Sequence, residues 1–273
     1  MKPYAILFSR PTFFKVADRK NPFMDPSVPV DRNLAVRQWD AVVQAFTASG
    51  LEALFIPALA ACEDMVFTAN PALTGMDNQG KRVAIASTMK FPSRRHEVAP
   101  QVEELRRIGY EIARANSAIA FEGGGDAVWN FERRLLFLGV GPRTSIAMQP
   151  LLEHIYGVDV LPLQLISERF YHLDTALCVL NNSTAIAYPN AFYDASWAII
   201  EAHFERIIVV DEDEGSRMAC NAAQAGGNTV IIEASAKSTV DHLDRMGYNV
   251  VPVDTSEFMK SGGSVYCMKQ YIF

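Results

Sequence analysis

The feature that most constrains the fold of this chain is a unit that recurs five times along it, an amphipathic helical stretch followed by a short apolar strand. The helical stretches place apolar residues three or four positions apart, as Val102, Leu105 and Ile108 do, and several of them end at a glycine. The middles of the five strands are 58, 48, 48 and 43 residues apart, at Leu54, Ile112, Val160, Ile208 and Val251. Units of similar length that each expose an apolar face can bury it by stacking around an axis.

Pairs of shorter strands accompany this unit and complete a strand–hairpin–helix pattern. Three pairs are clear in the sequence, at 66–73 with 81–87, at 127–130 with 133–140, and at 175–180 with 184–189. The fourth unit offers a strand at 229–233 and the fifth offers one at 265–268, which residues 4–8 would complete by closing a ring. We therefore predict an α/β fold in which residues 1–273 form a single closed domain. An ordinary α/β sandwich with irregular spacing is the alternative.

Composition and charge exclude several classes of protein. Hydrophobic residues make up 49% of the 273, which is enough for a large core and excludes a disordered chain. With 25 Lys and Arg against 31 Asp and Glu, we expect no general binding of nucleic acid or of anionic membranes, although a small cationic ligand is compatible. The four cysteines form no disulfide framework, and no His/Cys cluster indicates a metal site. The sequence shows neither a signal peptide nor a long apolar run, so we predict a cytoplasmic protein.

A polar or glycine-rich segment precedes the first hairpin strand of each unit, and equivalent positions in a ring face the same end of its axis. We therefore predict one pocket that gathers six side chains from distant segments: Asp64, Glu122, Asp126, His172, Asp174 and Cys267. Each acid alone is equally explained as a turn or capping residue, and the imidazole as a hydrogen-bonded structural histidine.

The cysteines differ in their surroundings. Cys178 and Cys220 stand in apolar or helical surroundings that are typical of a core. Cys267 follows a Gly-Gly-Ser segment, where the backbone can approach a ligand closely, and is therefore the candidate nucleophile. A buried, inert thiol is the alternative for Cys267.

Five short motifs at these positions resemble those of the guanidino-group-modifying enzymes, a superfamily of arginine deiminases, dimethylargininases, arginine dihydrolases and amidinotransferases. The motifs occur in the expected order along essentially the whole chain: DMVFTAN at 64–70, FEGGGD at 121–126, GPRTS at 141–145, YHLDTA at 171–176 and GGSVYC at 262–267. The fold of that superfamily, called the pentein fold, is a five-bladed α/β propeller of pseudo-symmetric ββαβ repeats. The resemblance implies this fold here, in agreement with the repeat found in the sequence.

The resemblance also implies a catalytic set of three residues. Cys267 would be the nucleophile, His172 the general acid and base, and Glu122 the partner of His172 and of a substrate nitrogen. Attack of the thiolate on the guanidinium carbon would give a covalent S-alkylthiouronium, which water then hydrolyses. This chemistry requires no metal and no organic cofactor.

The binding residues follow from the same resemblance. Asp64 and Asp174 would hold the guanidinium, because a planar cation with several N–H groups matches carboxylates. Asp126 belongs to the same expected substrate-binding set. Arg143 would pair with the α-carboxylate of the substrate, and Asn70 could position the ureido group for a second hydrolysis. Arg94 or Arg95 would assist, and residues 11–30 form a candidate lid.

The expected function is hydrolysis of the guanidino C–N bond of arginine or an N-methylated arginine, which gives citrulline or, by double hydrolysis, ornithine. The residues leave three alternatives open: an amidinotransferase, a non-enzymatic binding protein on the same propeller, and a metal-dependent hydrolase. The expected partner is a small guanidino compound, and the sequence leaves homo-oligomerisation open.

Overall fold

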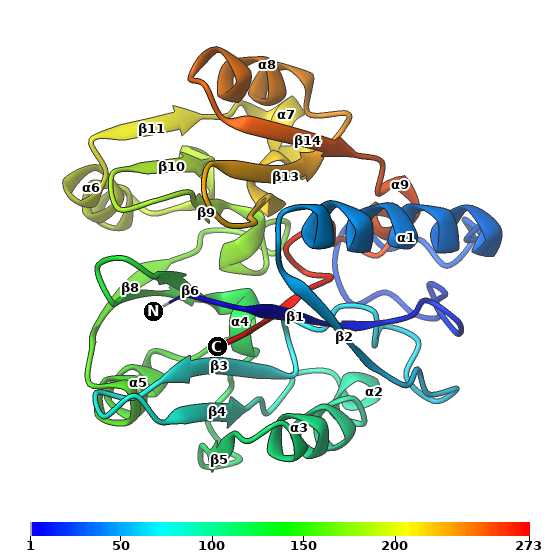
Figure 1. Cartoon of the computed structure of the whole chain (residues 1–273), viewed down its shortest axis with the longest axis horizontal. Coiled ribbons are helices and arrows are strands. Elements are labelled where there is room, and N and C mark those ends of the chain that lie inside the picture. Colours follow the sequence, from blue (N-terminus) through cyan, green and yellow to red (C-terminus); the bar gives the residue numbers. More distant parts are fainter. Residues whose placement is uncertain (1) are drawn as a thin grey trace.

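The computed structural model describes residues 2–273, whose strands form five three-stranded sheets arranged around a central axis (Figure 1). In each sheet an antiparallel pair of strands is extended by a third strand that runs parallel to the middle one. This arrangement confirms the predicted five-bladed α/β propeller. The strands are β1 (Ala5–Ser9), β2 (Glu52–Ile56), β3 (Ala72–Met76), β4 (Arg82–Ala86), β5 (Glu111–Arg114), β6 (Ala127–Asn130), β7 (Leu135–Val140), β8 (Asp159–Gln164), β9 (Leu177–Val179), β10 (Thr184–Ala187), β11 (Arg206–Val209), β12 (Ala223–Gln224), β13 (Thr229–Glu233), β14 (Asn249–Val253) and β15 (Gln270–Ile272).

The two ends of the described chain close the ring within one sheet. Strand β1 pairs antiparallel with β15, with Ala5 opposite Ile272, and parallel with β2, with Ala5 opposite Glu52. Every residue of β1 is buried, because strands cover both of its edges and side chains cover both of its faces. The predicted closure of the ring by residues near the N-terminus is therefore confirmed.

The amphipathic helices lie on the outside of the ring, as Figure 1 shows for α1, α3, α5, α6 and α8. Helix α1 begins after Asp31, whose side chain accepts a hydrogen bond from the Leu34 amide at 3.0 Å. Helix α5 ends at Gly157, whose φ of 59° is the left-handed conformation that stops a helix. The helices are α1 (Arg32–Ala48), α2 (Pro92–Arg95), α3 (Val98–Arg107), α4 (Gly123–Asp126), α5 (Gln149–Tyr156), α6 (Asp194–His203), α7 (Glu212–Ser216), α8 (Lys237–Arg245) and α9 (Ser256–Met259).

Two predicted strand segments are wrong. Residues 265–268 form turns, and β15 begins only at Gln270. The amides of Ser264 and Cys267 donate to the side chain of Asn221, so the main chain there bonds to a side chain rather than to a strand. Residues 66–70 likewise form turns before β3. An apolar composition is shared by a strand and a buried turn, so periodicity over five residues does not separate them.

Short turns of helix carry polar side chains at one end of the inner strands. Helix α4 precedes β6, a 3₁₀ turn at Leu173–Thr175 precedes β9, and a 3₁₀ turn at Ala219–Asn221 precedes β12. Within residues 2–273 no helix is long and apolar enough to cross a bilayer.

Closure of the ring should make β15 essential for stability. Replacing the fully buried Ile272 with Ala should lower the free energy of unfolding by about 2–5 kcal/mol, because it leaves a cavity beside β1. The same change at Ile146, which is 48% exposed, should stay within about 0.5 kcal/mol. Urea unfolding followed by tryptophan fluorescence measures both, and equal effects at the two positions would contradict the closure argument.

Candidate active site

A small cavity of about 10 Å³ lies where these polar turns meet. Four of the predicted site residues, Asp64, Asn70, Arg143 and Cys267, contribute to its wall. The wall is completed by residues of the predicted lid and of neighbouring turns: Lys20, Asn21, Met24, Phe67, Arg94, Tyr171 and Ser261. Hydrogen bonds connect Glu122, His172 and Asp174 to this wall.

The sulfur of Cys267 lies against a carboxylate. Its thiol donates to Asp174 Oδ2 at 3.1 Å and accepts from Asn221 Nδ2 at 3.3 Å. Cys267 is buried, and burial together with the neighbouring Asp174 raises the pKa of its thiol well above the ordinary value. Cys267 is therefore a thiol at neutral pH.

Asp174 itself is fully buried, and burial raises the pKa of its carboxyl to about 7, against the opposing effect of the Cys267 thiol. Its second oxygen, Oδ1, has no hydrogen-bond partner among residues 2–273. A buried acceptor without a partner is costly, so this oxygen is suited to an N–H donor from a ligand.

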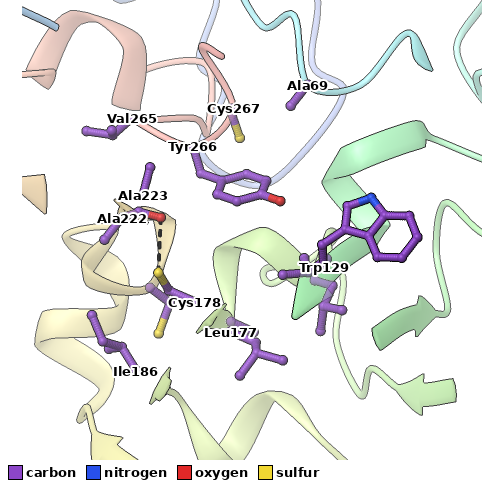
Figure 2. Close-up of a cluster of buried hydrophobic side chains, with 14 of the residues drawn as sticks. Ala69, Trp129, Leu177, Cys178, Ile186, Ala222, Ala223, Val265, Tyr266 and Cys267 are labelled. Atoms are coloured by element: carbon purple, nitrogen blue, oxygen red, sulfur yellow. Dashed lines mark hydrogen bonds between the residues drawn. The ribbon is translucent and has the colours of Figure 1, made fainter. Parts of the chain in front are cut away.

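Cys178 differs from Cys267 in its contacts, as Figure 2 shows. The Cys178 thiol donates to the Ala222 carbonyl at 3.2 Å, on an element that packs among apolar side chains. Burial raises the pKa of Cys178 to about 12. Its predicted role as a core residue is confirmed, and the same holds for the fully buried Cys220.

His172 and Glu122 form a buried pair. Nε2 of His172 lies 2.6 Å from Glu122 Oε2, and both side chains are fully buried. Burial opposes ionisation of Glu122, but His172 and then Arg143 outweigh it and lower the pKa of this carboxyl well below its usual range. Glu122 is therefore an ionised acceptor, which directs the Nε2 proton toward it and leaves Nδ1 on the other side of the ring.

Two short segments hold the imidazole and the thiol at the same end of the axis. The Ala69 amide donates to the Cys267 carbonyl at 3.1 Å, while Nδ2 of the adjacent Asn70 lies 3.4 Å from His172 Nδ1. Asp174, two residues after His172, contacts the sulfur directly. The predicted convergence of these distant segments is present.

Asn70 is held by an arginine that the sequence could not place securely. Arg94 is buried, donates to Asn70 Oδ1 at 3.1 Å and forms an ion pair with Glu97 at 2.8 Å. Burial raises the pKa of Glu97 to about 7, although Arg94 opposes the shift. Arg95 instead donates to the Met89 carbonyl and lies away from this cavity. Of the two candidates, Arg94 is the one at the site.

Arg143 lies between two aromatic rings at the cavity wall. Its guanidinium carbon is 4.7 Å from the centre of the Phe91 ring and 4.6 Å from that of Tyr171. One nitrogen donates to Glu122 Oε2 at 2.9 Å and the other to the Lys20 carbonyl at 2.7 Å. The guanidinium of Arg143 is therefore held in place beside the pair of His172 and Glu122.

Asp126 lies behind the cavity wall. Its Oδ2 accepts from the Thr144 hydroxyl at 2.6 Å, and its Oδ1 accepts from the Leu173 amide at 3.0 Å. Burial raises the pKa of Asp126 to about 6. Oδ1 thus anchors the backbone next to His172, and Oδ2 holds the side chain of Thr144. Direct contact of Asp126 with substrate stays a prediction.

Sequence reasoning missed Asn221, which holds the turn that carries Cys267. Its Nδ2 donates to the Asp174 carbonyl at 3.0 Å as well as to the sulfur, and its Oδ1 accepts from the amides of Ser264 and Cys267. Asn221 stands in an apolar stretch, MACNAA, that shows no motif. An isolated buried Asn between apolar residues is the signal that could have marked it.

Lys269 was also not predicted. Its side chain is buried, and its Nζ lies 3.1 Å from the centre of the Tyr266 ring and 3.7 Å from that of Tyr271. Burial lowers the pKa of Lys269 well below its ordinary value, although the charges of Asp174 and Cys267 oppose this. A buried lysine therefore stands two positions after Cys267.

A larger cavity of about 280 Å³ lies at the opposite ends of inner strands, beside Trp129, Asn130 and Leu180. It is lined by none of the predicted site residues, so the smaller, polar cavity is the candidate active site. Among residues 2–273, no group of three or more His, Cys, Asp or Glu side chains is arranged to hold a metal ion.

Comparison with protein families and known sequences agrees with this geometry. Residues 10–273 match the family model described as N,N dimethylarginine dimethylhydrolase, eukaryotic. The chain is 34% identical over 257 residues to an N(G),N(G)-dimethylarginine dimethylaminohydrolase of Mycobacterium tuberculosis, covering 94% of this chain and 82% of that relative. It is 32% identical to the bifunctional arginine dihydrolase/ornithine cyclodeaminase AgrE of Nostoc sp., covering 91% of this chain but only 35% of that longer protein.

Solved structures show the same architecture. The N-terminal domain of ArgZ bound to product, described as an arginine dihydrolase from cyanobacteria, superposes with a TM-score of 0.92 at 27% identity, covering 100% of this chain and 98% of that one. The same domain covalently bound to a reaction intermediate gives a TM-score of 0.91. The chain is a hydrolase of C–N bonds in linear amidines and belongs to the N,N-dimethylarginine dimethylhydrolase family, within the guanidino-group-modifying superfamily.

Proposed function

We propose that this chain hydrolyses the guanidino C–N bond of arginine or of an N-methylated arginine through a covalent intermediate on Cys267. The observation that carries the proposal is the buried Asp174 carboxyl, which contacts the sulfur through Oδ2 and leaves Oδ1 without a partner among residues 2–273. A guanidinium bound to this carboxylate would bring its central carbon next to the sulfur. The catalytic pair of His172 and Glu122 lies at the same end of the axis.

Substrate binding supplies the charge that activates the nucleophile. The thiol pKa of Cys267 is raised by burial and by Asp174, so a thiolate in the free enzyme is disfavoured. A bound guanidinium places a positive charge beside both groups and stabilises the thiolate. The thiol proton passes to His172, and the thiolate attacks the guanidinium carbon.

Breakdown of the tetrahedral adduct uses the same imidazole twice. His172 returns its proton to the departing nitrogen, which leaves as ammonia or as a methylated amine, and the S-alkylthiouronium remains on Cys267. Neutral His172 then removes a proton from water, which attacks the same carbon. The C–S bond breaks, the ureido product leaves, and the thiolate recovers its proton from His172. Glu122, held ionised, stabilises the imidazolium in both halves of the cycle.

Asn70 favours a second hydrolysis, which would give ornithine. Its Nδ2 lies 3.4 Å from His172 Nδ1, and Arg94 fixes its Oδ1, so the amide is oriented at the position where water is activated. The support from relatives is that AgrE and ArgZ are described as arginine dihydrolases. We propose this dihydrolase activity as the second candidate, alongside single hydrolysis to citrulline.

Product analysis tests the proposed function. With arginine or dimethylarginine, the purified chain should release ammonia or dimethylamine together with citrulline or ornithine. Cys267→Ser should reduce the rate by more than about 1,000-fold, because the hydroxyl does not replace the thiolate as nucleophile. The control Cys178→Ala should keep the activity within a few-fold, since Cys178 contacts only the protein core. Unchanged turnover by Cys267→Ser would reject the covalent mechanism.

The pH dependence should follow Asp174. Its pKa of about 7 in the folded protein means that the carboxyl is neutral below pH 7 and ionised above it. A neutral carboxyl cannot hold a guanidinium, so kcat/KM for arginine should fall about tenfold per pH unit below this value. Asp174→Asn should be weakly active and should lack this step. A wild-type profile that is flat between pH 5 and 8 would contradict the assignment.

The role of Asn70 predicts a change in product rather than in total rate. Asn70→Ala should lower the ratio of ornithine to citrulline by more than about tenfold, because water is no longer positioned for the second attack. Chromatographic separation of the two products from arginine measures this ratio. Citrulline as the sole end product of the unaltered chain would exclude the dihydrolase and leave single hydrolysis.

A further inference from the structure

Tyr171 is a buried side chain in the wall of the candidate active site, and the proposed mechanism does not use it. Its hydroxyl donates to the Gly262 carbonyl at 2.8 Å, and the centre of its ring lies 4.6 Å from that of the next residue, His172. Burial and, in addition, the nearby Cys267 raise the pKa of the phenol well above its ordinary value, so the hydroxyl keeps its proton and remains a donor. One side chain therefore contacts both the imidazole and the segment that leads to Cys267.

The segment that accepts this hydrogen bond is flexible by composition. Gly262 has a φ of 82°, in the left-handed region, and a second glycine follows it, so the side chains that normally restrict a main chain are missing here. Hydrogen bonds from other blades hold the segment instead. Tyr171 bonds to the Gly262 carbonyl near its start, and Asn221 accepts from the amides of Ser264 and Cys267 further along. Because Gly262 is buried, loss of the Tyr171 hydroxyl would leave this carbonyl without its side-chain donor and would favour a rearranged turn.

The ring of Tyr171 has a second contact, with Arg143. The guanidinium carbon of Arg143 lies 4.6 Å from the centre of this ring, and the Phe91 ring lies on the guanidinium as well, at 4.7 Å. Arg143 donates to Glu122 Oε2 at 2.9 Å, the same oxygen that lies 2.6 Å from His172 Nε2. The ring therefore helps to place both the arginine and, through the carboxylate, the imidazole.

We propose that Tyr171 is a positioning residue for the hydrolysis, which holds the sulfur of Cys267 and the imidazole of His172 in their mutual arrangement. The hydroxyl acts through the turn that carries Cys267, whereas the ring acts through Arg143 and the imidazole. This inference rests on the proposed function, because it gives Tyr171 a part in the reaction of Cys267. Phenylalanine keeps the ring and lacks the hydroxyl, so the two contributions can be measured separately.

Tyr171→Phe tests the hydroxyl. With arginine or dimethylarginine as substrate, kcat should fall about tenfold, because the sulfur is no longer held in place for attack. KM should stay within about twofold, because the ring still contacts Arg143. Urea unfolding of the same protein shows how much stability has been lost with the hydrogen bond.

Tyr156→Phe is the matched control for this variant. Tyr156 is fully buried, and its hydroxyl also donates to a main-chain carbonyl, that of Leu73 at 3.0 Å, outside the candidate site. The control should lose a similar amount of stability and keep kcat within about twofold. A merely structural role of Tyr171 would lower stability in both variants without a difference in kcat. A fall in kcat of Tyr171→Phe that is no larger than that of Tyr156→Phe would therefore overturn the proposal.

Tyr171→Leu tests the ring. It removes the aromatic face from Arg143 in addition to the hydroxyl, so KM should rise about tenfold above that of Tyr171→Phe. The fall in kcat should be at least as large as in Tyr171→Phe. A KM equal to that of Tyr171→Phe would reject the part of the proposal that concerns the ring.

Covalent labelling of Cys267 separates this inference from the proposed function, because it requires no turnover. The probe is 2-chloroacetamidine, a small amidinium that is attacked by a thiolate with loss of chloride, and mass spectrometry measures the rate. Labelling should be about tenfold slower in Tyr171→Phe than in the unaltered chain and should be unchanged in Tyr156→Phe. Slower labelling together with no turnover of arginine or dimethylarginine by the unaltered chain would support the effect of Tyr171 on Cys267 and reject the proposed hydrolysis. Turnover by the unaltered chain, with equal labelling and equal kcat in the two variants, would reject the role of Tyr171 alone. Neither labelling nor turnover in the unaltered chain would reject both.

Discussion

The site depends on the closure of the ring between β1 and β15. This pairing brings the last strand of the chain beside the first, and the turn that carries Cys267 comes directly before β15. Closure therefore brings Cys267 to the axis, where Asp174 and Asn221 from two other blades contact its sulfur. The contact between Cys267 and Asp174 depends on the fold, because the two residues lie in segments that are far apart in the sequence.

Burial of several acids around this axis gives the site its chemistry. Water is largely excluded, so each carboxylate is either matched by a cation or shifted toward its neutral form. Glu122, with His172 and Arg143 beside it, stays ionised, whereas burial raises the pKa of Asp174 to about 7 and that of Asp126 to about 6. Carboxyl groups around the same axis thus differ in pKa because their neighbours differ. We expect a cationic ligand at the unpartnered oxygen of Asp174 to lower the pKa of this carboxyl.

The chain supplies its own cation to part of the site. Lys20 pairs with Asp64, and its carbonyl accepts from Arg143, so both charged groups have partners within the chain. We expect a substrate that binds Asp64 and Arg143 to displace Lys20 from them.

Periodicity and five short motifs were enough to predict the propeller, the ring closure and the convergence of Cys267, His172, Glu122 and Asp174. These features depend on spacing and residue type, which a sequence states directly. Only the tertiary structure showed that residues 265–268 form a turn and that Arg94 rather than Arg95 reaches the site. It alone also showed that Asn221 contacts Cys267. The physical reason is that each of these depends on a hydrogen bond to a distant segment, and a one-dimensional pattern does not record which distant groups are left to pair. The same holds for Lys20, whose charge looks like any surface lysine until the fold places Asp64 opposite it.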